Sequence, residues 1–288
     1  MKYAALLLIA LAPLSFAQGP DAKFKSAEVS PGIYMIDGVE GFVGGNVTLL
    51  VGEQSVVMID DVLVSTIAAL AETAAGIAGR PVDFVINTHV HGDHTGGNEM
   101  ISGTGAIIVA HDNVRKRMLP DTDLNTGSGA LPVITFSDQV TFNVNGQEAF
   151  VFHIEHAHTD GDAAILFREA NVIATGDVMF HKIFPFIDLD SGGTVVGYIA
   201  GQQEIISMAN DATIIIPGHG PLANKADLVA DRAMLIDALA QVQGLVEKGL
   251  SEDEILAANP LAAYQHYSWS FITTERMTKT IIRSLTTD

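Results

Sequence analysis

The side chains best suited to chemistry in this chain stand in one six-residue stretch, which carries His89, His91, Asp93 and His94. Imidazole and carboxylate groups bind zinc or iron well, and the chain contains no cysteine that could add a thiolate ligand. An apolar run at 83–88 precedes the stretch and predicts a buried strand. A solvated polar loop is the plain alternative, but three histidines and an aspartate rarely gather this closely, so we favour a metal-binding loop.

Three more candidate ligands follow along the chain, and each comes after an apolar, β-branched run. They are His158, Asp177 and His219. Loops at the ends of strands in an α/β scaffold commonly hold active sites. Four separate strand ends that deliver ligand residues therefore predict a metal site assembled by the whole fold.

The order of these motifs resembles that of the metallo-β-lactamase superfamily. The pattern is an aspartate that ends an early strand, then H-x-H-x-D-H, then a histidine, an aspartate and a histidine, which here are Asp60, the stretch from His89 to His94, His158, Asp177 and His219. The resemblance covers most of the chain and implies an α/β fold, an αββα sandwich of two mixed β-sheets with helices on the outer faces. It is specific for the fold and for a two-metal site, and it says little about the substrate.

The resemblance also implies which residues hold each metal. One ion is held by His89, His91 and His158, the other by Asp93, His94 and His219, and Asp177 bridges the two. The spacing agrees with this division, because side chains two apart in an extended segment face the same way. Two Zn²⁺ are expected, with iron or manganese left open.

The expected reaction is hydrolysis of an acyl bond in a lactam, ester, lactone or thioester, β-lactams included. A hydroxide shared by the two metals attacks the acyl carbon, and one metal polarises the carbonyl. Asp93 is expected to orient the hydroxide and to carry its proton. Asp60 either supports a ligand loop through a hydrogen bond or is an ordinary residue at a strand end.

Two other functions stay open at this point. In the first, His89, His158 and Asp177 bind a single iron that oxidises persulfides; in the second, the chain is a non-catalytic, metal-binding periplasmic protein. The absence of cysteine excludes the β-lactamase subclasses that use a Cys ligand. The bridging aspartate is typical of the glyoxalase II type, yet no basic cluster for glutathione stands near the C-terminus.

The remaining histidines divide into two sets. His153 falls in an alternating strand and is expected to point away from the site, and His111 and His266 are expected to be structural. His156 and His181 are close enough in sequence to the candidate ligands to contact them or the substrate. Asp160 and Asp162 have the same ambiguity, and the aromatic and acidic segment 184–193 predicts a pocket wall or lid, or simple core packing.

Composition indicates a globular, acidic protein. The 288 residues are 48% hydrophobic and 17% charged, with a formal net charge of −19, which disfavours nucleic-acid partners and leaves a small molecule as the expected substrate. Lys2, the apolar segment 4–14 and a small-x-small site ending at Ala17 predict a signal peptide over 1–17, with an uncleaved anchor as the alternative. The expected mature chain is one domain, 18–288, secreted to a bacterial periplasm and free of the membrane, with an oligomeric state that the sequence does not fix.

The elements expected around the motifs are mostly strands, followed by helices in the last third. Residues 18–30 are expected to be a flexible lead-in, and 212–216 the last strand. A helix is expected over 65–77 and another over 112–119, with an apolar stripe from Leu228 to Val246 in a C-terminal helix. The other expected strands are 33–36, 47–51, 56–59, 107–110, 133–136, 139–144, 148–154, 163–167 and 172–175.

Overall fold

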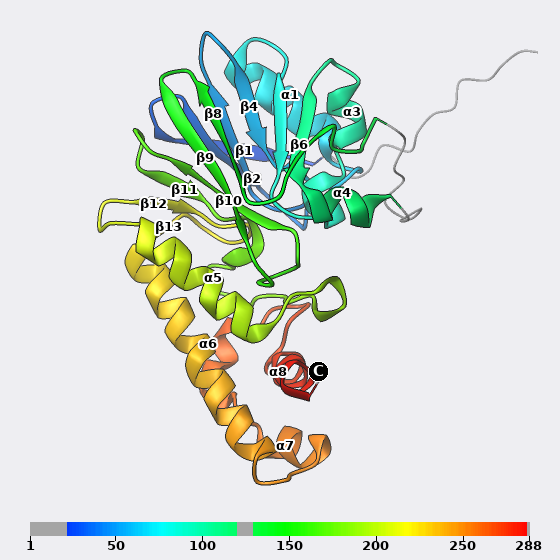
Figure 1. Cartoon of the computed structure of the whole chain (residues 1–288), viewed down its shortest axis with the longest axis vertical. Coiled ribbons are helices and arrows are strands. Elements are labelled where there is room, and N and C mark those ends of the chain that lie inside the picture. The colour runs from blue at the N-terminus through cyan, green and yellow to red at the C-terminus, as the bar shows by residue number, and fades with distance from the viewer. Residues whose placement is uncertain (1–21, 120–128, 287–288) are drawn as a thin grey trace, which may run out of the picture.

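Two β-sheets form the upper part of the molecule and a group of helices the lower part (Figure 1). The computed structural model describes residues 22–119 and 129–286. The expected signal peptide at 1–17 lies outside the described residues. So does most of the stretch 120–131, whose Gly, Asp, Asn and Thr residues predict a surface loop. Within the described part, no helix combines the length and the apolar character needed to cross a membrane.

The first sheet has seven strands in sequence order. The first four pair antiparallel and the last four pair parallel, so the sheet is mixed. Its strands are β1 (Phe24–Ser30), β2 (Ile33–Gly38), β3 (Val47–Val51), β4 (Val56–Ile59), β5 (Phe84–Asn87), β6 (Ile107–His111) and β7 (Ile134–Phe136).

The second sheet has six strands in the order β13-β12-β11-β10-β9-β8. All of its neighbours pair antiparallel except β11 and β12, which are parallel. Its strands are β8 (Gln139–Val144), β9 (Gln147–Ile154), β10 (Asp162–Phe167), β11 (Val172–Ala174), β12 (Ile214–Ile216) and β13 (Ala223–Asn224). Asn145 and Gly146 join β8 to β9 with φ of 56° and 73°, the hairpin turn that their types predict.

The two sheets pack face to face, and side-chain alternation along each strand builds the layers. In β10, Ile165 and Phe167 belong to the core between the sheets, whereas Ala164 and Leu166 face the helices on the outer side. Successive side chains of a strand point to opposite faces, so a strand that is apolar throughout contributes to both layers. Every residue of β10 is buried, which is why the sequence shows an uninterrupted apolar run there.

Helices cover both outer faces and complete the expected αββα order. α1 (Ile67–Ala78) packs on the first sheet, together with Ile101 of α3 (Asn98–Ser102). The outer face of the second sheet carries apolar side chains of α5 (Val195–Met208), α6 (Lys225–Val246) and α8 (Thr274–Thr286). The short helices are α2 (Gly92–Thr95), α4 (Asp112–Met118), α7 (Glu252–Ala258) and the 3₁₀ turns η1 (Gly176–Val178), η2 (Leu189–Ser191) and η3 (Ala262–Tyr267).

Two expectations about the elements were wrong, and one long helix was not expected. The lead-in at 18–30 contains β1, which pairs with β2 from Phe24 to Ser30 with one irregularity between Glu28 and Ser30. The edge of a sheet can hold such a largely polar strand. The last strand is β13, which follows the expected one. The unexpected helix is α5. Its buried face includes Gly201 and Gln202 among its apolar residues, so the helical period of its apolar residues is blurred.

The core between the sheets should dominate stability. Phe167 is fully buried there, so Phe167→Ala should lower the free energy of unfolding by about 3–5 kcal/mol. The same truncation at Phe42, which is 60% exposed, should change it by less than about 0.5 kcal/mol. Urea unfolding followed by circular dichroism measures both values, and equal losses would contradict the packing described.

Candidate metal centre

Seven side chains singled out from the sequence meet at one end of the sandwich, in two groups. The first contains His89, His91, His158 and Asp177, and the second contains Asp93, His94 and His219. Within each group, one potential ligand atom from every residue lies within 4.8 Å of the others. The structure therefore places together all of the residues expected to hold metal, in the same two sets.

Asp177 connects the two groups. Its Oδ2 lies 3.6 Å from Nε2 of His89 and 3.4 Å from Nε2 of His158. Its Oδ1 lies 3.2 Å from Nε2 of His94 and 3.5 Å from Nε2 of His219. Each carboxylate oxygen thus faces one group, which is the arrangement that a bridging ligand requires.

The ligands come from strand ends in both sheets. The H-x-H-x-D-H stretch follows β5 of the first sheet and runs into α2. The other three residues belong to the second sheet: His158 lies between β9 and β10, Asp177 lies in η1 after β11, and His219 follows β12. Asn46, just before β3, ties the two halves together, since its Nδ2 donates to the carbonyls of Pro217 and Gly220.

Asp60 fixes the ring of His94. Its Oδ2 accepts a hydrogen bond of 2.8 Å from Nδ1 of His94, so the proton is on Nδ1 and Nε2 faces the site. The same carboxylate accepts from the backbone N–H and the hydroxyl of Thr88, both at 2.7 Å. Asp60 has a φ of 62°, which turns the chain sharply at the end of β4. The geometry agrees with the supporting role considered for Asp60.

Two further ligand rings are oriented by the segment 184–193. The carbonyl of Phe186 accepts from Nδ1 of His158 at 2.8 Å, which leaves Nε2 of that ring for the site. Asp188 lies 2.9 Å from Nε2 of His91, so His91 presents Nδ1 instead. The two free nitrogens lie 2.8 Å apart. Part of the segment is therefore a support for the metal centre.

Burial and charge set the protonation of the cluster. Burial lowers the pKa of His89 well below its usual value and that of His158 to about 4, so both are neutral bases. Burial opposes ionisation of Asp177, but the surrounding histidines hold its pKa well below the usual value. Burial would also lower the pKa of His219, yet Asp177 and Asp93 together raise it to about 9. At neutral pH the cluster thus combines neutral rings at His89 and His158 with a protonated His219 beside the ionised Asp177.

The cluster fits a divalent metal. Two of its buried atoms, Nε2 of His89 and Oδ1 of Asp177, make no hydrogen bond within the described part of the chain. Buried polar atoms in proteins are nearly always paired, so atoms without a protein partner indicate a bound ion, a water or a function. Neutral imidazole and carboxylate are usual ligands of zinc, and both unpaired atoms belong to residues of the first ligand group.

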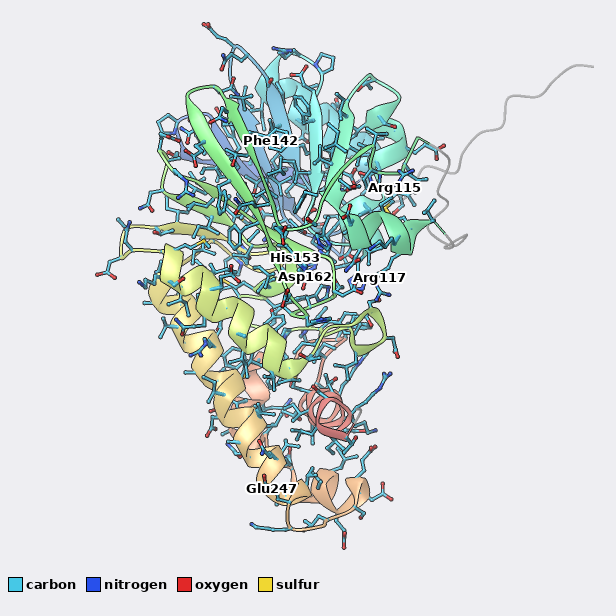
Figure 2. The ribbon with its side chains drawn as sticks, in the orientation of Figure 1. Arg115, Arg117, Phe142, His153, Asp162 and Glu247 are labelled. Carbon is cyan, nitrogen blue, oxygen red and sulfur yellow. The ribbon has the colours of Figure 1, made fainter. Side chains whose placement is uncertain are left out.

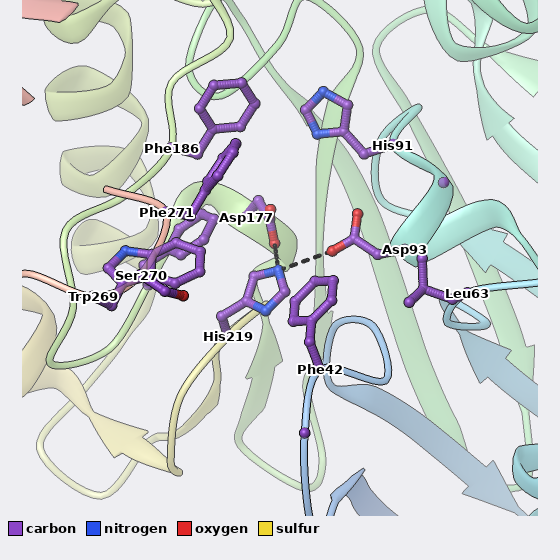
Figure 3. Close-up of a pocket in the computed structure, with 13 residues that line it drawn as sticks. Phe42, Leu63, His91, Asp93, Asp177, Phe186, His219, Trp269, Ser270 and Phe271 are labelled. Carbon is purple, nitrogen blue, oxygen red and sulfur yellow. Dashed lines mark ion pairs between the residues drawn. The ribbon is translucent and has the colours of Figure 1, made fainter. Parts of the chain in front are cut away.

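A pocket opens over the centre and has a volume of about 760 Å³. His91, Asp93, Asp177 and His219 contribute to its floor. Figure 3 shows aromatic rings on either side, with Phe42 facing the other aromatic residues across His219. The remaining lining residues are Gly41, Leu63, Gly92, Phe180, Phe186, Trp269, Ser270 and Phe271.

Comparison with known proteins identifies the family. Residues 41–219, more than half of the chain, match the family model of the metallo-beta-lactamase superfamily. The chain belongs to the metallo-β-lactamase superfamily. The expected fold is thereby confirmed. The superfamily typically binds metal ions, and the histidine and aspartate cluster is a candidate site for them.

Curated members of the superfamily are similar to part of the chain. A hydroxyacylglutathione hydrolase from a Polaromonas species is 28% identical over 172 residues, which are 56% of this chain and 60% of that protein. One from Brucella anthropi is 24% identical over 156 residues, 53% of each chain. A probable metallo-hydrolase of Bacillus subtilis is 26% identical over 145 residues, 48% of this chain and 68% of that protein. The match thus spans little more than half of the first two relatives.

Solved structures of the superfamily share the fold. A metallo-β-lactamase from Pontibacter korlensis superposes with a TM-score of 0.64 at 17% identity, over 75% of this chain and 100% of that one. The DIM-1 metallo-β-lactamase gives a TM-score of 0.63 at 16% identity, over 76% and 100%. At these identities the likeness concerns the fold alone.

The other histidines lie outside both ligand groups. The His153 ring stacks on His111 with centroids 3.8 Å apart, and its Nδ1 donates to the carbonyl of Asp162, beside which it is labelled in Figure 2. His153 does not line the pocket. His156 contacts the carbonyl of Gly192, and His266 is exposed.

His181 is buried and pairs with Asp231 of α6 at 3.3 Å. Its backbone N–H donates to the carbonyl of His219, so it supports that loop without lining the pocket.

The two aspartates that the sequence left ambiguous support the loop before β10. Asp160 forms a two-bond pair with Arg117 of α4. The buried carboxylate of Asp162 accepts from the backbone N–H groups of His158 and Thr159 and from the Thr159 hydroxyl. Burial raises the pKa of Asp162 to about 7 despite these bonds.

Sequence reasoning missed the far wall of the pocket. Trp269 and Phe271 lie in the turn between η3 and α8, about 50 residues beyond His219, and no ligand motif accompanies them. The usable signal was the chain's single tryptophan near the end of an otherwise helical region. Aromatic residues in such a turn are as often core residues as pocket residues.

Asp60→Asn should weaken metal binding at the second group. An amide can present its N–H₂ to Nδ1 of His94 and favour the wrong tautomer, which costs metal sites about 10–100-fold in affinity. Competition with a chromophoric chelator measures the loss. Unchanged affinity for both ions would show that Asp60 is an ordinary strand-end residue.

Gly218→Ala should disturb the bridge without touching a ligand. A Cβ at this position would lie 2.1 Å from Oδ1 of Asp177 and 2.6 Å from the backbone of Gly176, so the carboxylate must move. We expect metal content to fall by at least about one ion per chain on elemental analysis.

The matched control is Gly244→Ala in α6, where a Cβ meets nothing within 4 Å. It should retain metal and gain up to about 1 kcal/mol in the free energy of unfolding. Full metal content in Gly218→Ala would contradict the placement of Asp177.

Proposed function

We propose that the protein is a metal-dependent hydrolase that cleaves an acyl bond. The observation that carries the proposal is the pair of ligand groups joined by Asp177 at the floor of a substrate-sized pocket. The curated relatives named as hydrolases support the same reaction class. Zn²⁺ is the ion that the imidazole and carboxylate donors favour, with two ions per chain.

His89, His91 and His158 would hold one ion and Asp93, His94 and His219 the other, with Asp177 shared. Two divalent ions at such a site lower the pKa of a shared water and polarise a substrate carbonyl. The Asp177 side chain, 4% exposed, lies between the two ligand groups, and Asp93, 19% exposed, is the more accessible of the two carboxylates that line the pocket. Oδ2 of Asp93 lies 3.3 Å from Nε2 of His219 and is placed to accept a proton and return it to the leaving group.

The second ligand group argues against the single-iron alternative. An iron held by His89, His158 and Asp177 would leave no purpose for the buried His94 and the adjacent His219. Those two rings face the opposite oxygen of Asp177, at 3.2 and 3.5 Å. A complete second set is the expected property of a two-metal hydrolase.

Metal content and Asp177→Ala test the proposal together. The purified chain should hold about two zinc ions, and chelation should abolish hydrolysis of ester, lactone, thioester and β-lactam substrates until zinc is restored. Asp177→Ala should lose at least one ion. Its activity should fall by more than the ~10–100-fold that the loss of a residue supporting a metal ligand costs.

Asp211→Ala is the matched control, because Asp211 is an exposed aspartate in the turn before β12. It should keep both ions and full activity. A single iron with oxygen consumption, or full zinc loading without turnover of any of the four substrate classes, would overturn the proposed function.

A further inference from the structure

We propose that the pocket takes neutral esters or lactones with an aliphatic or aromatic acyl chain and discriminates against chains that carry a carboxylate. The inference rests on the proposed function and names its substrate class. In the reaction, a water oxygen forms a bond to the acyl carbon and the bond from that carbon to the alcohol oxygen breaks. The alcohol oxygen takes up a proton, so an ester gives a carboxylic acid and an alcohol, and a lactone gives one hydroxy acid.

Aromatic side chains from distant parts of the chain make the pocket walls. Phe42 lies on the segment between β2 and β3, and Phe186, Trp269 and Phe271 stand opposite (Figure 3). The three rings opposite Phe42 contact one another. The ring centroids lie 5.3 Å apart for Phe186 and Phe271 and 5.6 Å apart for Trp269 and Phe271. Nε1 of Trp269 donates to the carbonyl of Phe184 at 2.9 Å, which fixes the ring in the wall.

The walls remain open to solvent. Among the exposed large apolar side chains of the described residues, only two are aromatic, Phe42 at 60% and Phe271 at 43%, and both line this pocket. An exposed aromatic pair beside a site of reaction is costly unless a ligand covers it, and such patches commonly mark binding grooves. An apolar acyl chain would bury both rings.

Charge is confined to the floor. The ionisable lining residues are His91, Asp93, Asp177 and His219, and no lysine or arginine lines the pocket within the part of the chain that the structure describes. A carboxylate on the acyl chain would lose its hydration among the aromatic walls with no cation to pair with, and this is strongly unfavourable. Ser270 is the one other polar side chain in the lining, and it is uncharged.

The basic side chains nearby belong to a separate surface. The Arg276 guanidinium lies 3.8 Å from the centre of the Phe271 ring and donates to the Phe271 carbonyl. Arg276 lines a neighbouring cavity of about 290 Å³ with Lys279 and Arg283, which also contains Asp188 and Asp190. Lys279 and Arg283 are paired with Glu275 and Asp190. These three basic side chains line the neighbouring cavity and do not line the pocket.

A series of p-nitrophenyl esters tests the inference on zinc-loaded protein. From acetate through butyrate to octanoate, kcat/KM should rise by at least about tenfold, because longer chains contact more of the walls. In the hydrogen suberate ester, a carboxylate replaces the terminal methyl of octanoate. Its kcat/KM should be at least about tenfold lower than that of octanoate. Phe42→Ala and Phe271→Ala should flatten the length dependence, and Val133→Ala, an exposed apolar residue before β7, should retain it.

Binding to metal-free protein gives a readout that does not depend on turnover. Trp269 is the only tryptophan of the chain, so its fluorescence reports on the pocket wall directly. Octanamide should change the emission and bind at least about tenfold more tightly than the monoamide of suberic acid, which has the same length and a terminal carboxylate.

The two proposals fail in different ways. Equal or tighter binding of the charged amide, or faster cleavage of the suberate ester than of octanoate, would overturn the substrate class and leave the hydrolase function standing. Discrimination in fluorescence without hydrolysis of any ester, lactone, thioester or β-lactam would overturn the hydrolase function and leave the preference of the pocket standing.

Discussion

The structure depends on one buried carboxylate that four histidine rings surround. Asp177 is nearly inaccessible to solvent, and its two oxygens lie within 3.6 Å of imidazole nitrogens that belong to both sheets. A buried charge is tolerated only when its partners are held in place. The loops, turns and hydrogen bonds around the site can be understood as the means of holding those partners.

A second layer of acids and carbonyls holds the ligand residues in place, and each member bonds to a different ring or loop. Asp60 holds His94, Asp188 holds His91, and the carbonyl of Phe186 holds His158. Asp162 holds the backbone of the His158 loop. The tautomer of each ring follows from these partners, so the nitrogens that face the centre are chosen before any metal binds.

The sequence allowed the centre to be predicted more fully than the pocket. The ligands stand in short motifs after apolar strands, and a strand end places a side chain regardless of what the rest of the chain does. Trp269 and Phe271 reach the same pocket only because α6 and η3 return the chain to it, and that path depends on helix packing that no local pattern encodes. For the same reason β1 was missed, since its pairing with β2 and not its own polar sequence makes it a strand.

The division of the ligands between the sheets has a mechanical consequence. One half of the sandwich supplies the H-x-H-x-D-H stretch, and the other supplies His158, Asp177 and His219. Each ion would therefore bind ligands from both sheets. In a chain without cysteine, such ions would act as removable cross-links between the halves. Loading would then raise resistance to unfolding by mass action, and the supply of metal would set both the lifetime of the folded chain and its chemistry.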